Sequence, residues 1–289
     1  MRIDLHAHST ASDGTEPPAE VVRRAAAAGL DVVALTDHDT TAGWPAAAAA
    51  LAGHGGRIAL VPGAEISAAV TGAATGRRIG VHLLGYLFDP AEPALAGELA
   101  LLRDDRRRRA ARMVELLAGL GAPVTYDDVA ALAAGAPVGR PHVARALVAA
   151  GVVPDLAAAF GPEWIGTGGR AWVAKRAVEA ATAVELVRRA GGVTVLAHPA
   201  AGRCGPVLAD DDVAALAAAG LTGIEVDHPD HDRAARDRLR ALAGGLGLVV
   251  TGASDDHGAA TGHRLGAELT APEAYEALVE AAGHPPLAA

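Results

Sequence analysis

The pattern that decides the fold is clearest in Val32-Val33-Ala34-Leu35-Thr36-Asp37-His38-Asp39, where four apolar residues lead directly into a polar run with two acids and a histidine. The β-branched content and the length of residues 32–35 are typical of a buried strand. Similar strands are predicted at residues 3–5, 58–62, 81–86, 193–197, 223–226 and 248–251, with helical patterns between most of them. This alternation predicts an α/β barrel with a mostly parallel sheet.

The middle of the chain has a different pattern. Between about residues 89 and 175 helix follows helix, charged residues gather at 103–112, and convincing strands disappear. We therefore predict that residues 89–175 form a small inserted helical domain. Residues 1–88 and 176–289 would together build the barrel. A chain of 289 residues is long enough for one barrel with such an insertion.

The composition narrows the classes of function. The chain has 34 acidic and 25 basic residues, and its net charge of −9 disfavours binding to a DNA duplex or other long nucleic acid. A small anionic substrate stays possible, because metal ions held by carboxylates supply positive charge locally. The single cysteine, Cys204, excludes an intrachain disulfide. With no leader-like segment and no apolar run of about 18 residues, we expect a cytoplasmic protein without membrane contact or an obligate protein partner.

Potential metal ligands follow the predicted strands one after another. His6 and His8 alternate on an extended segment and so point to the same side, although an isolated pair of this kind also fits exposed or hydrogen-bonded histidines. The chemistry of imidazole and carboxylate without thiolate is typical of sites for Mn²⁺, Zn²⁺ or Fe²⁺, and so many ligands would suit two or three ions. The other candidate ligands are Asp13, His38, Glu65, His82, His198, Asp255 and His257.

The order of these motifs resembles that of the PHP (polymerase and histidinol phosphatase) family. The matching stretches are Asp4-Leu5-His6-Ala7-His8-Ser9, Thr36-Asp37-His38-Asp39, Gly63-Ala64-Glu65, Leu196-Ala197-His198-Pro199 and Ala253-Ser254-Asp255-Asp256-His257-Gly258. The resemblance implies a TIM-like, distorted (β/α)₇ barrel with a trinuclear metal centre, in which residues 1–88 and 176–289 form the metal-binding barrel and residues 89–175 cap the substrate site. It implies a first ion held by His6, His8, Glu65 and Asp255, a second held by Glu65, His82 and His198, and a third held by Asp13, His38 and His257.

One branch of this family is especially similar: it removes the 3′-phosphate from nucleoside 3′,5′-bisphosphates to give nucleoside 5′-monophosphates, and some members also trim RNA from the 5′ end. Its marks here are residues 36–43, residues 139–145 and Trp172-Val173-Ala174-Lys175, where Ala174 replaces a usual proline. The resemblance implies that Arg140, His142 and Lys175 bind the second phosphate. For Arg140 alone, a surface salt bridge is the alternative.

Further expectations concern mechanism. A metal-bound hydroxide would attack phosphorus in line, so that no protein nucleophile is needed. Asp37 would orient a ligand histidine or transfer a proton, with a helix N-cap as an equally supported alternative. Glu225 and His228 follow another strand and are expected in the substrate pocket. The Arg106-Arg107-Arg108-Arg109 run predicts a solvated helix more than an RNA-binding face, because successive residues point around a helix.

Two other functions stay open. The first is a histidinol-phosphate phosphatase, which Asp13 disfavours because that branch usually has histidine at this position, and which the helical insertion also disfavours. The second is a non-catalytic or proofreading metal-binding PHP module. Loss of activity predicts gaps in the ligand set, and none of the expected ligand positions is missing.

Overall fold

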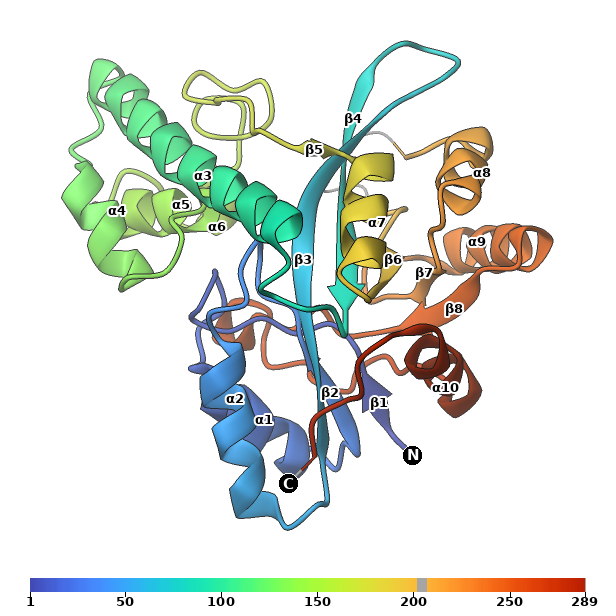
Figure 1. Cartoon of the computed structure of the whole chain (residues 1–289). Helices are drawn as coiled ribbons and strands as arrows, with labels where there is room; N and C mark the ends of the chain where they lie inside the picture. The colour runs from blue at the N-terminus through green and yellow to red at the C-terminus, as the bar shows by residue number, and fades with distance from the viewer. Residues whose placement is uncertain (202–206, 289) are drawn as a thin grey trace.

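The computed structural model describes residues 1–201 and 207–288, so the expected loop thiol Cys204 lies outside the described residues. A nearly closed barrel of seven strands forms its centre (Figure 1). The predicted α/β, TIM-like barrel is therefore confirmed. Around the sheet the strands follow in the order β1 Ile3–Asp4, β2 Val32–Leu35, β3 Ala59–Thr71, β4 Arg78–Tyr86, β6 Val193–Ala197, β7 Gly223–Asp227 and β8 Val249–Gly252, and the short β5 Val178–Glu179 pairs with β3 outside this order.

The two ends of the sheet meet just beyond β1 and β8. Ala7 forms a parallel bridge with Asp256, and the backbone N–H of His8 donates to the carbonyl of Asp256 over 2.8 Å. The loop after the first strand thus lies beside the loop after the last. This closure brings ligands from opposite ends of the chain to one rim.

The strands β3 and β4 depart from the sequence prediction. β4 runs antiparallel to both β3 and β6, while the other neighbours on this path are parallel. β3 continues far beyond the predicted end at Pro62, and β4 begins three residues earlier than predicted. Proline usually lies at the edge or the end of a strand, but here its carbonyl accepts a hydrogen bond from the N–H of Leu87 over 2.9 Å. Glu65 consequently lies inside a paired strand and not after its end, whereas His82 lies within a strand as predicted.

Helices surround the barrel and close its core. In α1, for example, Val21, Val22 and Ala25 share one buried face, and the helix is followed by Gly29 at φ +73°, a backbone conformation that glycine adopts without strain. The barrel helices are α1 Pro18–Ala27, α2 Trp44–Leu51, α7 Ala180–Arg189, α8 Asp210–Ala218, α9 Arg233–Leu246 and α10 Pro272–Ala281, with short 3₁₀ turns η1 Ala52–His54 and η3 Gly258–Ala260.

Four further helices form a separate lobe beside the barrel (Figure 1): α3 Pro93–Gly119, α4 Tyr126–Ala133, α5 Arg140–Ala149 and α6 Leu156–Ala159. This lobe has its own apolar cluster, which includes Leu117, Val143 and Ile165. The first half of α3, with Leu95 and Leu102, packs into a barrel cluster instead. The helix is thus shared by both parts, and the domain boundaries at 88/89 and 175/176 stay a prediction.

Searching the described residues for a helix long and apolar enough to cross a membrane gives no candidate.

Candidate metal centre

The rim of the barrel gathers all nine predicted ligand side chains. They come from the residues that follow β1, β2, β6 and β8 and from within β3 and β4. Within each of four overlapping groups, the potential ligand atoms lie within 4.8 Å of one another. The groups are His6, His8 and Asp255; His6, Glu65 and His198; His38, Glu65 and His82; and His8, Asp13, His38 and His257.

The first group converges tightly. The Nε2 atoms of His6 and His8 lie 3.1 Å apart. They lie 3.4 and 3.3 Å from Oδ1 of Asp255, and 3.5 and 3.2 Å from Oε2 of Glu65. These four side chains are the set that the family resemblance implies for one ion.

Glu65 connects His6 and His8 to two further histidines. Its other carboxylate oxygen, Oε1, lies 2.7 Å from Nδ1 of His82 and 2.9 Å from Nε2 of His198. Burial alone would raise the pKa of Glu65, but His38, His82 and His6 outweigh it and hold that pKa well below the usual range. An ionised carboxylate with one oxygen toward each histidine group has the geometry of a bridging ligand.

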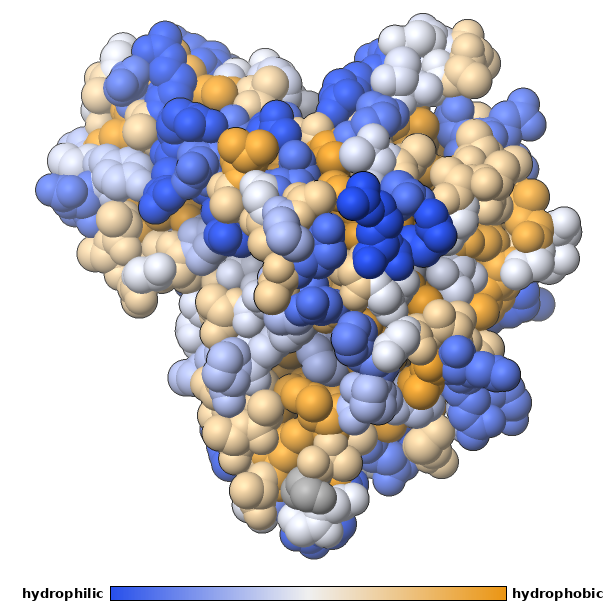
Figure 2. Space-filling model, in the orientation of Figure 1, coloured by the Kyte–Doolittle hydropathy of each residue, from blue (hydrophilic) through white to orange (hydrophobic). Residues whose placement is uncertain are grey.

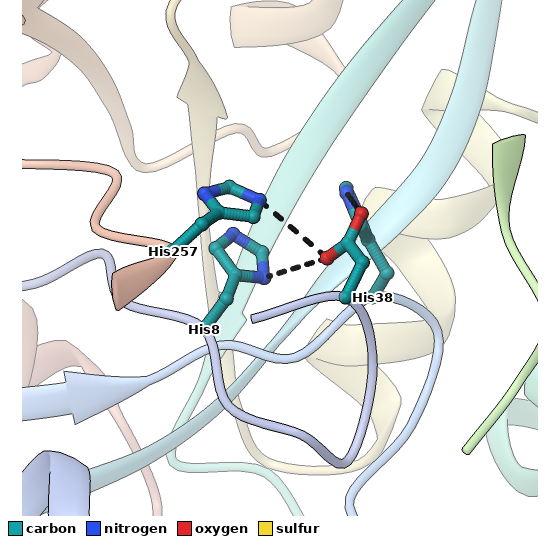
Figure 3. A group of neighbouring side chains, drawn as sticks. His8, His38 and His257 are labelled. Carbon is teal, nitrogen blue, oxygen red and sulfur yellow. Dashed lines mark ion pairs between the residues drawn. The ribbon is translucent and has the colours of Figure 1, made fainter. Parts of the chain in front are cut away.

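The last of the four groups joins Asp13 to His8, His38 and His257, and Figure 3 labels these three histidines. Oδ1 of Asp13 lies 3.5 Å from Nε2 of His257 and 3.9 Å from Nδ1 of His8, and Oδ2 lies 3.7 Å from Nε2 of His38. His38 also faces the other groups, because its Nδ1 lies 2.9 Å from Oε2 of Glu65. His8 and His38 therefore each belong to two of the four groups, although the resemblance assigns each of them to a single ion.

The donor set fits divalent cations. Among the described residues, Nδ1 of His8, His38 and His82 is buried and has no hydrogen-bond partner, although carboxylate oxygens lie nearby. Burial lowers the pKa of His6, yet Asp255, Glu225 and Glu65 more than offset this and raise it to about 9. So many buried carboxylates require positive charge, which protons on the histidines or metal ions can supply.

A buried carboxylate behind the site corrects one expectation. Glu225 is fully buried, its Oε1 lies 3.1 Å from Nδ1 of His6, and its Oε2 accepts from the backbone N–H of His198 over 2.8 Å. It therefore holds the ring of the candidate ligand His6, and it is not among the residues that line the cavity described below. Sequence had suggested such an orienting role for Asp37, whose contacts lie elsewhere.

Asp37 holds the loop that carries Asp13. Its carboxylate accepts hydrogen bonds from the N–H and Oγ of Ser9 and from Oγ of Ser12, over 2.6 to 2.8 Å. The helix-cap alternative is wrong, because the N-cap of α2 is Gly43 and has no side-chain cap. A proton-transfer role for Asp37 stays a prediction.

The prediction that the whole arginine run is solvated is also wrong. Arg106 is buried, and its guanidinium donates to Oδ2 of Asp39 over 2.6 Å and to Oγ of Ser67 over 3.0 Å. Nε of Arg109 donates to the carbonyl of Val173 over 2.8 Å. Arg107 is exposed, as predicted, and it pairs with Asp104. Figure 2 shows hydrophilic residues on the visible face of the helical lobe formed by α3 to α6.

Sequence reasoning missed Arg106 although a signal was present. Arg106 is spaced four and seven residues from the buried apolar residues Leu99, Leu102, Ala110 and Met113 of α3, which places it on the buried face of that helix. Its partner Asp39 has φ +56°, a strained conformation for a residue with a side chain. The contacts of Asp39 hold this geometry directly after His38.

The four predicted substrate residues lie in different surroundings. Nζ of Lys175 lies 3.1 Å from Nε2 of His82, and Nε2 of the buried His228 lies 3.6 Å from Oδ2 of Asp255, so both adjoin the ligand groups. Nδ1 of His142 instead accepts from the N–H of Gly139 over 2.9 Å and so caps α5. The guanidinium of Arg140 lies 5.2 Å from the centre of the Phe160 ring.

A cavity of about 210 Å³ lies between the helical lobe and the ligand groups. On the lobe side it is lined by Pro141 and Arg145 of α5 and by Leu156 of α6. On the barrel side its lining includes the ligand residues Asp13, His198, Asp255 and His257, together with His228 and Arg264. The candidate ligands therefore open to a space that the lobe covers.

Fold and side chains together define a TIM-like barrel whose rim is rich in histidine and carboxylate side chains. Residues 4–118 match the model of the PHP domain. The chain is 36% identical to a 3′,5′-nucleoside bisphosphate phosphatase of Chromobacterium violaceum over 91% of this chain and 89% of that protein. It is 40% identical to a 5′-3′ exoribonuclease of Haemophilus influenzae over 68% of this chain and 69% of that one.

A solved structure agrees with these sequence relatives. A protein of Bifidobacterium adolescentis, assigned as a metal-dependent phosphoesterase, superposes with a TM-score of 0.89 and 36% identity, covering 97% of this chain and 96% of that one. The chain belongs to the PHP family.

Proposed function

We propose that this protein is a metal-dependent hydrolase of phosphate esters that removes the 3′-phosphate from nucleoside 3′,5′-bisphosphates and leaves nucleoside 5′-monophosphates. The observation that carries the proposal is Glu65, which presents one carboxylate oxygen to His6 and His8 and the other to His82 and His198. Such a bridge suits two adjacent ions, and the Asp13 group suits a third. The relatives named above support the nucleotide substrate.

The ions that suit these ligands are Mn²⁺, with Zn²⁺ and Fe²⁺ as alternatives. When bound, divalent ions supply an activated water and neutralise the charge on the phosphoryl oxygens. The protein's own part is to hold the ligand atoms in place. Glu225 fixes the ring of His6, and Asp37 fixes the loop of Asp13.

The remaining cations and donors would bind substrate. Lys175 lies beside His82 and can donate to a phosphoryl oxygen. His228 has a buried Nε2 without a hydrogen-bond partner among the described residues, and it can donate to an oxygen near Asp255. In this proposal residues 89–175 cap the site, and Arg140 and His142 of the cap contribute to recognition of the second phosphate. Short 5′-phosphorylated RNA is a second candidate substrate, because a relative is an exoribonuclease.

Product release tests the substrate, with inorganic phosphate measured for the phosphate monoesters and released nucleotide measured for the RNA. Metal-depleted protein would be assayed with and without Mn²⁺ on adenosine 3′,5′-bisphosphate, histidinol phosphate, a simple monophosphate and 5′-phosphorylated short RNA. We expect Mn²⁺-dependent turnover with the highest kcat/KM for the bisphosphate. Faster hydrolysis of histidinol phosphate than of the bisphosphate would overturn the substrate assignment, and the absence of Mn²⁺-dependent turnover on every compound would overturn the enzyme class.

A double variant tests the metal site separately. Glu65→Ala with Asp255→Ala removes two acids from the ligand groups, so we expect lower metal content by elemental analysis and loss of activity. Glu163→Ala with Asp237→Ala removes the same charge from side chains that are 72% and 70% exposed, and should leave both measurements unchanged. Full activity of the first double variant with an intact fold would contradict the assignment.

A further inference from the structure

The backbone of the candidate ligand His198 is strained. Its φ is +29°, in a region that residues with a side chain seldom adopt, and the proline that follows it favours an extended conformation instead. Such conformations persist only where the surrounding structure holds them. The ring of His198 nevertheless has a defined place, because its Nε2 lies 2.9 Å from Oε1 of Glu65. Contacts around this backbone must therefore keep the ring where it is.

Two side chains from β7 and the loop after it hold the backbone around His198. Oε2 of Glu225 accepts from the N–H of His198 over 2.8 Å. Nε2 of His231 accepts from the N–H of Ala200 over 3.1 Å. Pro199 between them has no N–H of its own. The loop after β6 is thus bonded to the β7 segment on both sides of this proline.

The hydrogen bonds of His231 define its tautomer. Its Nδ1 lies 2.9 Å from the carbonyl oxygen of Val226, which can only accept, so Nδ1 carries the proton. Nε2 is then the bare nitrogen that the N–H of Ala200 requires. His231 is 4% exposed, and both of its ring nitrogens contact backbone groups. Its ring therefore connects two loops and is not itself placed as a metal ligand.

The loop that carries His231 is anchored by Arg236 of α9. Nε of Arg236 donates to the carbonyl of His231 over 3.1 Å, and Nη2 donates to the carbonyl of His228 over 2.7 Å. The same Nη2 lies 2.5 Å from Oε1 of Glu268. The loop after β7 is therefore a fixed support for the loop after β6.

We infer that His231 is a positioning residue, which keeps the backbone of His198 in its strained conformation and so keeps the imidazole of His198 directed at Glu65 for metal binding. This inference rests on the metal dependence of the proposed function and not on its substrate. Without an acceptor at residue 231, the N–H of Ala200 loses its partner and His198 can relax to a negative φ. Its ring then moves away from Glu65, while the Asp13 group keeps its ligands.

Two variants separate the acceptor of His231 from the rest of its ring. His231→Gln places an amide oxygen near the position of Nε2, where it can accept from Ala200. His231→Asn reaches only the position of Nδ1 and the carbonyl of Val226. We expect His231→Asn to weaken Mn²⁺ binding by about tenfold or more, as loss of a contact that supports a metal ligand typically does, and His231→Gln to recover most of the affinity.

Competition titrations against a chelator measure these affinities, and circular dichroism checks that each variant is folded. His54→Asn changes a histidine of η1, which precedes β3 at the end of the barrel opposite the rim, and should bind Mn²⁺ as wild type does. Equal affinity of the Gln and Asn variants would overturn the inference, because only one of them restores the acceptor.

A double-mutant cycle shows whether His231 acts through His198. In a His198→Ala background, His231→Asn should weaken Mn²⁺ binding no further, because the ring that it positions is gone. In an Asp13→Ala background its full effect should persist, because Asp13 belongs to another group of ligands. An effect that is lost in both backgrounds, or that persists in both, would overturn the inference.

These measurements need no turnover, so they separate this inference from the proposed function. If wild type binds Mn²⁺ and hydrolyses phosphate esters but His231→Asn binds the ion equally well, the inference alone is wrong. If wild type binds no divalent ion, both the metal-dependent function and the inference are wrong.

Discussion

The ion pair between Arg106 and Asp39 offers a sharp test of how the helical lobe and the barrel depend on each other. Nε of Arg106 donates to Oδ2 of Asp39 over 2.6 Å, and Asp39 is fully buried. Replacing Arg106 with methionine keeps an unbranched apolar stem but removes the charge. The carboxylate of Asp39 then keeps the N–H and Oγ of Ser67, at 2.7 and 2.8 Å, as neutral donors.

The expected cost is large because the charge left behind is buried. Removing one partner of a buried ion pair typically costs about 3–5 kcal/mol of unfolding free energy. Nη2 of Arg106 also donates to Ser67 over 3.0 Å, and that bond is lost as well. By contrast Arg107 is 63% exposed and pairs with Asp104 on the surface, where such a pair is worth about 0–1 kcal/mol. Arg107→Met is thus a matched control in the same helix.

Urea denaturation of EDTA-treated protein measures the difference without contributions from metal binding. We expect Arg106→Met to lower the free energy of unfolding by about 3–5 kcal/mol and Arg107→Met by less than about 1 kcal/mol. Adding Asp39→Asn to Arg106→Met should restore part of the loss, because the buried charge is then gone. A loss below about 1 kcal/mol for Arg106→Met, or one equal to that of Arg107→Met, would refute this account of the pair.

Three further predictions follow from the site. Glu225→Gln should weaken metal binding by about 10- to 100-fold, because a neutral amide replaces the carboxylate that orients the ring of His6. A titration with Mn²⁺ that shows unchanged affinity would contradict this prediction. Removing metal with EDTA should lower Tm by calorimetry, and re-adding Mn²⁺ should restore it, since the buried carboxylates lose their counter-charge; a Tm indifferent to both is the contrary result. Burial, and next the charge of Arg145, lower the pKa of His142 from the ordinary 6.5 to about 4. The contribution of neutral His142 to the free energy of unfolding is therefore complete above pH 6.5 and is lost as the pH falls toward 4. The matched variant is His142→Gln, which does not titrate but keeps an acceptor for the N–H of Gly139. In urea titrations between pH 6.5 and 4, wild type should lose more unfolding free energy than this variant, and parallel pH profiles of the two proteins would argue against the prediction.

The sequence predicted the barrel and the gathering of the candidate ligands at its rim, because both follow from local order. A candidate ligand that follows a strand closely, such as His38 after β2 or His198 after β6, lies at the rim because the carboxyl ends of parallel strands meet there. The reversed direction of β4 was not predictable from strand and helix alternation. His82 reaches the rim only because β4 is antiparallel to β3 and pairs it opposite Ser67, two residues beyond Glu65.

The contacts that support the ligands were harder to predict because they join distant parts of the chain. Glu225 orients His6 across 219 residues, and neither residue's neighbours in sequence indicate the other. Arg106 had a local signal, its place on the buried face of α3, but a run of four arginines suggested solvent. Only the fold shows that one member of the run meets Asp39. Residue spacing therefore predicts which side chains gather at the rim better than it predicts the contacts that hold them in place.

The shared helix α3 links the helical lobe to the candidate metal centre. Its first half packs into the barrel core and its second half into the core of the lobe. Between the two, Arg106 binds Asp39, and the backbone N–H of Asp39 donates to the carbonyl of Glu65 over 3.0 Å. A displacement of the lobe therefore acts on Asp39, the neighbour of His38, and through it on the backbone of Glu65. We therefore expect substitutions in the lobe that break this contact to displace the candidate ligands His38 and Glu65 as well.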